Sequence, residues 1–201
     1  MNNITKIQSQ INDLTTFMQT DVYSSLDEVT KASLIDKKVE LCGIYFLEIA
    51  ENLNRNKFKG CYAPHKAVMI MAIMELIESG HISSNVIYLD KDLKDKFKEV
   101  WQKTVPEGSP FKCEYWNPFT YMDSEPFWDL SNNKDKAFIT WEAFYAFSHE
   151  ASRITIKNYL RHSIKNDTII KQYDNNLPTI NMLAAENIMG IIPFICLLLV
   201  G

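Results

Sequence analysis

The amino-acid sequence predicts a mainly helical fold with a small β element, built around one buried helix at about residues 64–79. The first of three supporting observations is the apolar spacing of three and four over residues 4–18, which is the period of an amphipathic helix. The second is the unbroken apolar run at 67–74, and the third is a single short strand candidate at 86–89. Hydrophobic residues form 46% of the 201 residues, which is enough for one sizeable core.

The N-terminal segment predicts three helices in succession. Its first apolar side chains are Ile4, Ile7, Ile11, Leu14 and Met18. Two heptads are too few for a coiled coil, so we favour docking of this helix on the chain's own core over pairing with a second copy. A second helix is expected at 24–34 and a third from Asp36 to Leu53. Residues 1–38 are interpreted as a helical arm that precedes a domain at 39–176.

The segment before the central helix is strongly basic. Residues 54–66 hold three Lys, one Arg and one His, and they contain no acidic residue. Pro64 suits the first turn of a helix, where a missing N–H costs nothing, and Gly80 suits the position just past its end. Because residues 67–74 are apolar on every side, we expect this helix to be buried at the centre of the fold.

The second half of the chain alternates between regular segments and loops. A strand is expected at 86–89, followed by a helix that Asp90 caps and that runs to about Lys103. Residues 104–136 contain four Pro and many aromatic side chains, so they are predicted to be loop-rich. Helices are expected again at 141–147 and 152–172.

The last of these helices carries the most basic stripe in the chain. A spacing of four places Arg153, Lys157, Arg161 and Lys165 on one helix face. The net charge of −4 argues against a general polyanion-binding protein, but phosphate contacts need only a local basic patch. We therefore predict that Arg153, Lys157 and Arg161 contact DNA phosphates.

The two chain ends bear on location. The N-terminus has no apolar run, so no signal peptide is expected and the protein is predicted to be cytoplasmic. Residues 177–201 form an apolar tail whose last part, 188–201, is uncharged, interrupted by Pro193 and shorter than the ~20 residues of a spanning helix. No stable membrane span is expected. The tail is interpreted as a buried segment or the edge of a longer chain, in preference to a membrane-touching tail.

Motifs of catalysis and metal binding are sparse. No P-loop, GxGxxG, HExxH or GxSxG is present, and the four widely spaced cysteines form no CxxC pair and are expected to be small buried residues. We therefore predict no catalytic residue, no cofactor and no bound metal. The alternative is a divergent or truncated restriction endonuclease subunit that cuts DNA with a metal held by Asp123, Glu125 and His149.

Residues 60–130 resemble a known bacterial family. The run from Gly60 to Ile82 contains His65-Lys66 at a helix start, then an apolar helix and a Gly, and it is followed by matches at Asn85, Ile87, Leu93, Phe97 and Trp101. The segments 117–122 (NPFTYM) and 125–130 (EPFWDL) complete the pattern. This pattern is similar to the sulfur-binding domain that precedes HNH modules in modification-dependent restriction endonucleases, whose studied members recognise phosphorothioated DNA.

The resemblance implies a defence-related DNA-recognition module whose partner is double-stranded DNA, with or without phosphorothioate groups. In the module, His65 and Lys66 would face phosphate. Arg55 and Lys59, in the basic segment before the helix, are also predicted to bind the nucleic acid. An apolar cup for sulfur would be formed by Trp116, Pro118, Phe119 and Tyr121, with Asn117 beside it. Phe127 and Trp128 are expected to be core residues.

Three departures from the family pattern stand out. Ala67 replaces the usual Pro, and Asn117 precedes Pro118 where sulfur-binding members tend to carry an aromatic residue. No HNH pattern follows residue 177. The chain is therefore interpreted as a stand-alone module, a truncated product or one half of a two-chain system with its nuclease subunit supplied in trans.

Overall fold

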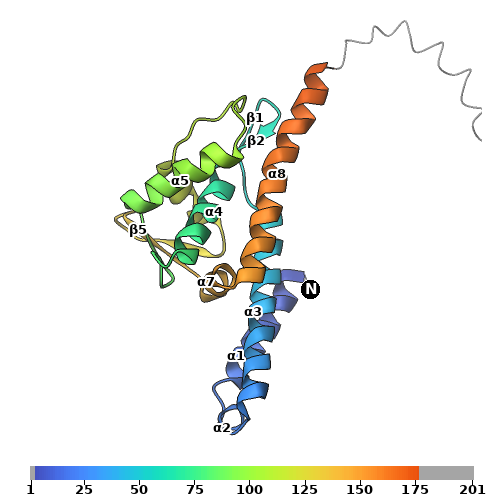
Figure 1. Ribbon diagram of the computed structural model, residues 1–201, viewed down its shortest axis with the longest axis vertical. Helices are drawn as coiled ribbons and strands as arrows, with labels where there is room; N and C mark the ends of the chain where they lie inside the picture. The colour runs from blue at the N-terminus through green and yellow to red at the C-terminus, as the bar shows by residue number, and fades with distance from the viewer. Residues whose placement is uncertain (1–2, 177–201) are drawn as a thin grey trace, which may run out of the picture. The chain divides into compact units, whose positions relative to one another are not determined.

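A computed structural model describes the backbone of residues 3–176 and the side chains of residues 3–166. The fold is mainly α with a small β element, as predicted (Figure 1). The helices are α1 (Asn3–Phe17), α2 (Asp21–Ser24), α3 (Glu28–Glu51), α4 (His65–Glu78), α5 (Lys91–Thr104), α6 (Trp116–Tyr121), α7 (Trp141–Ser148) and α8 (Glu150–Asn176), with a 3-10 turn η1 at Met122–Ser124. The contacts described below lie within the unit that ends at Thr168.

The N-terminal helices differ from the expectation in one respect. The two helices predicted at 24–34 and 36–53 are one long helix, α3, which Asp27 caps by accepting a hydrogen bond from the Thr30 N–H at 3.0 Å. No Gly or Pro lies between residues 28 and 42 to end it, so Asp36 is an interior helix residue. The predicted arm boundary at residue 38 therefore falls inside α3. Helix α1 docks on the chain's own core through Ile7 and Ile11, as favoured from the sequence.

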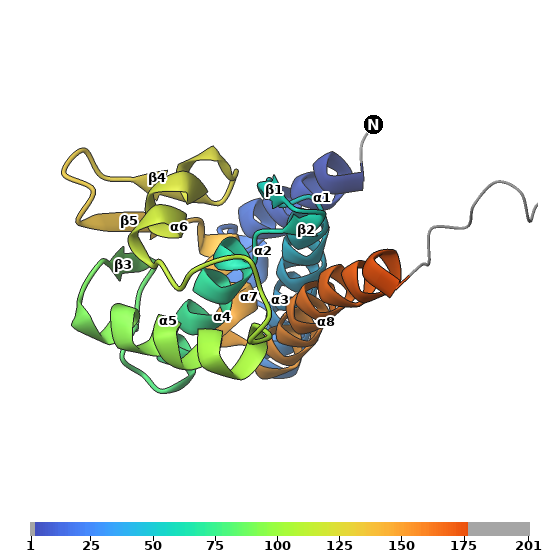
Figure 2. The ribbon, with the colours of Figure 1, turned by 90° about the horizontal axis from the view of Figure 1, so that it is seen from above.

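Helix α4 is the centre of the core. Pro64 occupies its N-cap, and Gly80 follows its end with a φ of +77°. Every side chain from Ala67 to Met74 is at most 1% exposed. Helices α5, α6 and α7 all pack against α4, and Figure 2 shows α4 between α5 and the layer of α3 and α8. The prediction of a buried central helix is confirmed.

The small sheet covers the side of the core near α6. Strands β3 (Val86–Tyr88), β5 (Lys136–Ile139) and β4 (Trp128–Leu130) pair antiparallel in the order β3-β5-β4. Ile87 and Leu130 both lie opposite Ala137, and the alternating residues Ala137 and Ile139 of β5 are buried. One face of this sheet therefore belongs to the core.

The basic segment predicted as a loop contains a β-hairpin. Strands β1 (Lys57–Phe58) and β2 (Cys61–Tyr62) pair antiparallel, with Lys57 opposite Tyr62. Lys59 and Gly60 connect them, with φ values of +49° and +81°. Two successive left-handed residues are the geometry of a tight turn that matches the twist of the strands.

The loop-rich prediction for 104–136 missed α6 and η1. These elements are short, and proline-rich sequence gives little periodicity from which to find them. Pro118 sits in the first turn of α6, where the helix tolerates it. Cys113 is exposed, in contrast to the buried Cys42 and Cys61, so the expectation of a buried thiol is wrong at that position.

The apolar tail at 177–201 lies outside the described residues, and so does Cys196. Within the part of the chain that the structure describes, no helix is long and apolar enough to cross a membrane.

Candidate functional site

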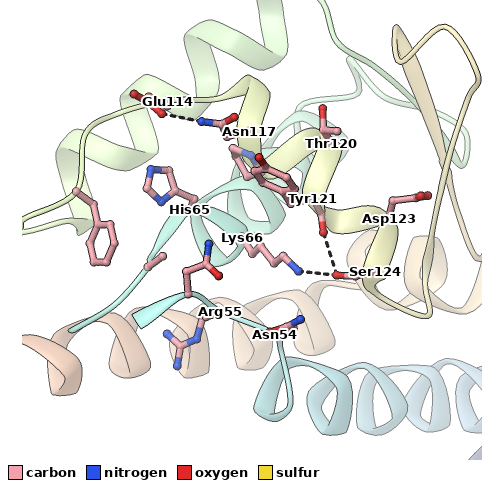
Figure 3. Close-up of a pocket in the computed structure, with 14 residues that line it drawn as sticks. Asn54, Arg55, His65, Lys66, Glu114, Asn117, Thr120, Tyr121, Asp123 and Ser124 are labelled. Carbon is pink, nitrogen blue, oxygen red and sulfur yellow. Dashed lines mark hydrogen bonds between the residues drawn. The ribbon is translucent and has the colours of Figure 1, made fainter. Parts of the chain in front are cut away.

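A pocket of about 660 Å³ opens at the N-terminal end of α4 (Figure 3). Its walls come from the basic segment before α4, from the first turn of α4, from the loop after α5 and from α6 with η1. Six residues predicted to bind nucleic acid line it, namely Arg55, His65, Lys66, Asn117, Pro118 and Tyr121. The structure therefore brings together residues that lie as far apart in the chain as 55 and 121.

The Lys66 side chain crosses beneath the pocket and forms an ion pair with Glu125. Lys66 is 8% exposed and Glu125 is 6% exposed. The Lys66 ammonium also donates a hydrogen bond to Ser124 Oγ at 3.0 Å, and Ser124 Oγ donates to the Tyr121 carbonyl at 3.0 Å. Glu125 Oε1 additionally accepts the backbone N–H of Asn54 at 3.2 Å. Lys66 thus ties α4, η1 and the basic segment together, which sequence reasoning did not anticipate.

His65 is held by two aromatic rings and one carbonyl. Its ring lies 4.8 Å from the Trp101 ring and 5.8 Å from the Phe111 ring, measured between centroids. Nε2 lies 2.7 Å from the Lys112 carbonyl oxygen, so the proton on this nitrogen donates to that oxygen. Burial lowers the pKa of His65, although the Lys112 carbonyl and the Glu114 charge act in the opposite direction. The imidazole is therefore neutral at pH 7, with Nδ1 as an acceptor.

Asn117 is oriented by an acidic neighbour. Its Nδ2 donates a hydrogen bond to Glu114 Oε2 at 2.7 Å, as Figure 3 shows. Asp123, on the far side of the pocket, accepts the Leu130 N–H through Oδ1 at 3.1 Å. The lining therefore contains two acidic side chains, Glu114 and Asp123, as well as the cations Arg55 and Lys66. Because Lys66 is already paired with Glu125, the fixed charges at the pocket do not favour an anion by themselves.

Three of the predicted contact residues lie outside the pocket lining. Phe119 is fully buried, with its ring 5.1 Å from that of Trp128, so it is a core residue and the prediction that it contacts DNA is wrong. Trp116 is 50% exposed on α6 and stacks edge-on against Tyr115. Lys59 lies at the exposed tip of the β1–β2 hairpin. The expected core positions of Phe127 and Trp128 are confirmed.

Two residues of the basic stripe on α8 differ from the expectation because their charges are used inside the protein. Arg153 is buried and donates to the Phe147 and Ser148 carbonyls at 3.1 and 2.9 Å and to Glu78 at 3.3 Å. It therefore satisfies the C-terminal carbonyls of α7. Lys157 lies 3.2 Å from a Glu75 oxygen and 3.5 Å from a Glu78 oxygen.

Arg161 is half-buried and lines a smaller cavity of about 230 Å³ together with Glu75 and Lys165. The face of α8 predicted to contact phosphate is thus turned, over its first turns, toward the acidic residues of α4. The basic stripe could not be recognised as paired from the sequence, because its acidic partners lie more than 70 positions away in the chain.

The alternative metal set of Asp123, Glu125 and His149 does not come together. Glu125 is committed to Lys66, while His149 ends α7 and contacts Ser152 at 3.3 Å. Among the described residues, no group of three or more His, Cys, Asp or Glu side chains is arranged to hold a metal ion.

Comparison with known proteins adds no relative. No protein-family model matches the chain, and no curated protein matches it significantly.

Proposed function

We propose that this protein is a recognition module for double-stranded DNA and that the pocket at the start of α4 receives a backbone phosphate, preferably as a phosphorothioate. The observation that carries the proposal is the convergence of Arg55, His65, Lys66, Asn117, Pro118 and Tyr121 on a single pocket. Five of them, His65, Lys66, Asn117, Pro118 and Tyr121, belong to the segment that carries the resemblance, and Arg55 belongs to the basic segment before α4.

The lining supplies the two kinds of surface that a phosphorothioate requires. The Pro118 ring, the Phe111 ring and the Ala63 methyl group offer apolar surface. Sulfur is larger than oxygen and accepts hydrogen bonds more weakly, so apolar contact favours it. The amides of Asn54 and Asn56 and the Arg55 guanidinium offer donors for the remaining oxygens.

The start of α4 adds to the attraction for an anion. No side chain caps this helix, and its first turn contains no acidic residue. The N–H groups of a helix N-terminus and the helix dipole both favour negative charge. Glu114 and Asp123 oppose this attraction. The apolar part of the lining favours an anion that loses its water easily over a strongly hydrated one, because desolvating the latter costs more.

Cleavage of DNA is assigned by this proposal to a nuclease subunit supplied in trans. The module would locate the modified site, and the partner would cut there. The proposal therefore predicts binding without cleavage by this chain.

The test measures dissociation constants for two duplexes of the same sequence, one with a phosphorothioate linkage and one without, at a single salt concentration. Each measurement is made with and without Mg²⁺, and the DNA is examined afterwards for breaks. We expect binding of both duplexes, tighter binding of the modified one and intact DNA. Absence of duplex binding would overturn the proposal, and metal-dependent cleavage would overturn the assignment of the nuclease to another chain.

A matched pair of variants on α6 tests the pocket itself. Tyr121 lines the pocket and is 61% exposed, whereas Trp116 is 50% exposed on the same helix and lies outside the lining. Tyr121→Ala removes a few tens of Å² of apolar contact, which at ~25 cal/mol per Å² is about 1 kcal/mol. The affinity ratio between modified and plain DNA should fall severalfold in Tyr121→Ala and stay constant in Trp116→Ala.

A further inference from the structure

The β1–β2 hairpin displays cations and aromatic rings on an exposed surface. Lys57, Phe58, Lys59 and Tyr62 are all exposed, with Phe58 at 51% and Tyr62 at 42%. The Lys57 ammonium lies 5.3 Å from the centre of the Tyr62 ring, and the Lys59 ammonium lies 5.4 Å from that of Phe58. Each lysine is thus held over a ring face, within the ~6 Å range of a cation–π contact.

These two lysines differ from three of the cations predicted to contact DNA. Lys66, Arg153 and Lys157 are all paired with glutamates. Within the described residues, neither Lys57 nor Lys59 forms an ion pair, and the sequence from 52 to 66 contains no acid. The hairpin therefore carries positive charge that the protein does not compensate.

The hairpin continues directly into the pocket wall. Asn54, Arg55 and Asn56 before it and Ala63 after it line the pocket, and the Ala63 N–H donates to the Asn56 carbonyl at 2.7 Å. Phe58 packs edge-on against Phe111, at 6.3 Å between ring centres, and Phe111 also lines the pocket. A ligand strand held in the pocket would therefore pass beside the hairpin.

Lys59 occupies an unfavourable backbone conformation. Its φ of +49° lies in the left-handed region, which Asn and Gly adopt more easily than Lys. A lysine at this turn costs stability relative to Asn, because Asn-Gly is the preferred pair for such a turn. Lysine, unlike Asn, places a positively charged ammonium group at the tip of the hairpin.

We propose that the β1–β2 hairpin enters the major groove of double-stranded DNA beside the pocket, with Lys57 and Lys59 contacting phosphates of the backbone. The inference rests on the proposed function and adds a second contact to it. A two-stranded β-ribbon fits the ≈ 12 Å width of the major groove. The uncompensated lysines complement the phosphates on the groove edges, and the pocket then receives a phosphate next to the ribbon.

The decisive variant is Lys59→Asn, which removes the charge and at the same time suits the turn. Its matched control is Lys134→Asn. Lys134 is also an exposed lysine with a positive φ, +57°, in the turn between β4 and β5, and it lies outside the pocket lining. Both variants lose one charge at a left-handed turn position, so a general effect of net charge appears equally in both.

The measurement is the affinity for a plain and a phosphorothioated duplex over a range of salt concentrations. Each phosphate contact contributes roughly 0.9 to the slope of log affinity against log salt. Lys59→Asn should reduce the slope by about one unit and weaken binding about fivefold near 0.15 M salt. It should affect both duplexes equally, because the hairpin holds the backbone and does not contact the sulfur. Lys57→Gln should act in the same way, and thermal melting should show both variants folded.

The possible outcomes separate the two proposals. Suppose that the wild-type protein binds duplex DNA and that Lys59→Asn and Lys57→Gln have the same salt slope of binding as Lys134→Asn. The hairpin proposal is then wrong and the pocket proposal stands. If the hairpin variants weaken the binding of single-stranded DNA more than the binding of duplex DNA, the major-groove placement is wrong. If wild-type protein binds no duplex, both proposals fail.

Discussion

The ammonium group of Lys66 and the carboxylate of Glu125 form a buried ion pair between residues 59 positions apart. The pair joins the first turn of α4 to the residue that follows η1. Glu125 thereby compensates the charge of Lys66 in the unliganded protein, although the sequence suggested that Lys66 binds phosphate. The pair also anchors the pocket wall formed by α6.

Glu125→Gln should strengthen DNA binding. The amide keeps an acceptor for the Asn54 N–H but removes the charge that opposes an anion in the pocket. We expect affinity for both plain and phosphorothioated duplexes to rise severalfold, with a salt slope steeper by up to about one unit. Glu107→Gln removes an exposed acid outside the pocket lining and serves as the control. Equal affinity of the two variants would show that the Lys66 charge does not act on DNA.

Lys66→Met should destabilise the fold strongly, because it leaves the Glu125 charge buried without a partner. Breaking a buried pair from one side costs about 3–5 kcal/mol. The double variant Lys66→Met, Glu125→Gln should recover a large part of this loss, since a neutral amide is cheaper to bury. Urea denaturation of the two single variants and the double variant measures the coupling. Additive losses would contradict the ion pair.

Arg153→Met should reduce stability and leave DNA binding unchanged. The substitution removes the hydrogen bonds to the Phe147 and Ser148 carbonyls and the pair with Glu78, at a cost of roughly 2–4 kcal/mol in the free energy of unfolding. Lys165→Gln, at an exposed cation of the same helix, is the control and should have little effect on stability. If a folded Arg153→Met protein showed a smaller salt slope for DNA binding, Arg153 would be a phosphate contact after all.

Stability should fall with decreasing pH in the range where His65 titrates. Burial lowers the folded-state pKa of His65 below the reference value of 6.5, so the unfolded chain binds more protons. The contribution of the neutral ring is fully present above pH 6.5 and is lost as pH falls from there toward the folded-state pKa.

The measurement is the urea midpoint at several pH values between about 7.5 and 5.5, compared between the wild type and His65→Gln. The exposed residues His81, His149 and His162 remain in both proteins, so the difference isolates His65. The variant should show the weaker pH dependence. Parallel curves would mean that the neutral imidazole contributes nothing.

The helices illustrate what local sequence is able to predict. The buried run of α4, with Pro64 before it and Gly80 after it, was recognisable because residues 67–74 are apolar on every side, which is typical of a helix at the centre of a core. The division of α3 into helices at 24–34 and 36–53 was wrong, because no Gly or Pro between residues 28 and 42 ends the helix there. The β1–β2 hairpin was missed because strands of two residues carry no periodicity.

The sequence by itself determined the helical class, the central buried helix and, through the basic segment and the resemblance, six residues of one pocket. Only the tertiary structure decided which cations face outward. Arg153 and Lys66 look as available in the sequence as Lys57 and Lys59 do, yet the first two are buried against Glu78 and Glu125. Their partners lie 59 and 75 positions away, and no local pattern encodes a pairing at such a separation. Compensation of one charge by another depends on the distance between the two groups in space, and packing of the whole core sets that distance.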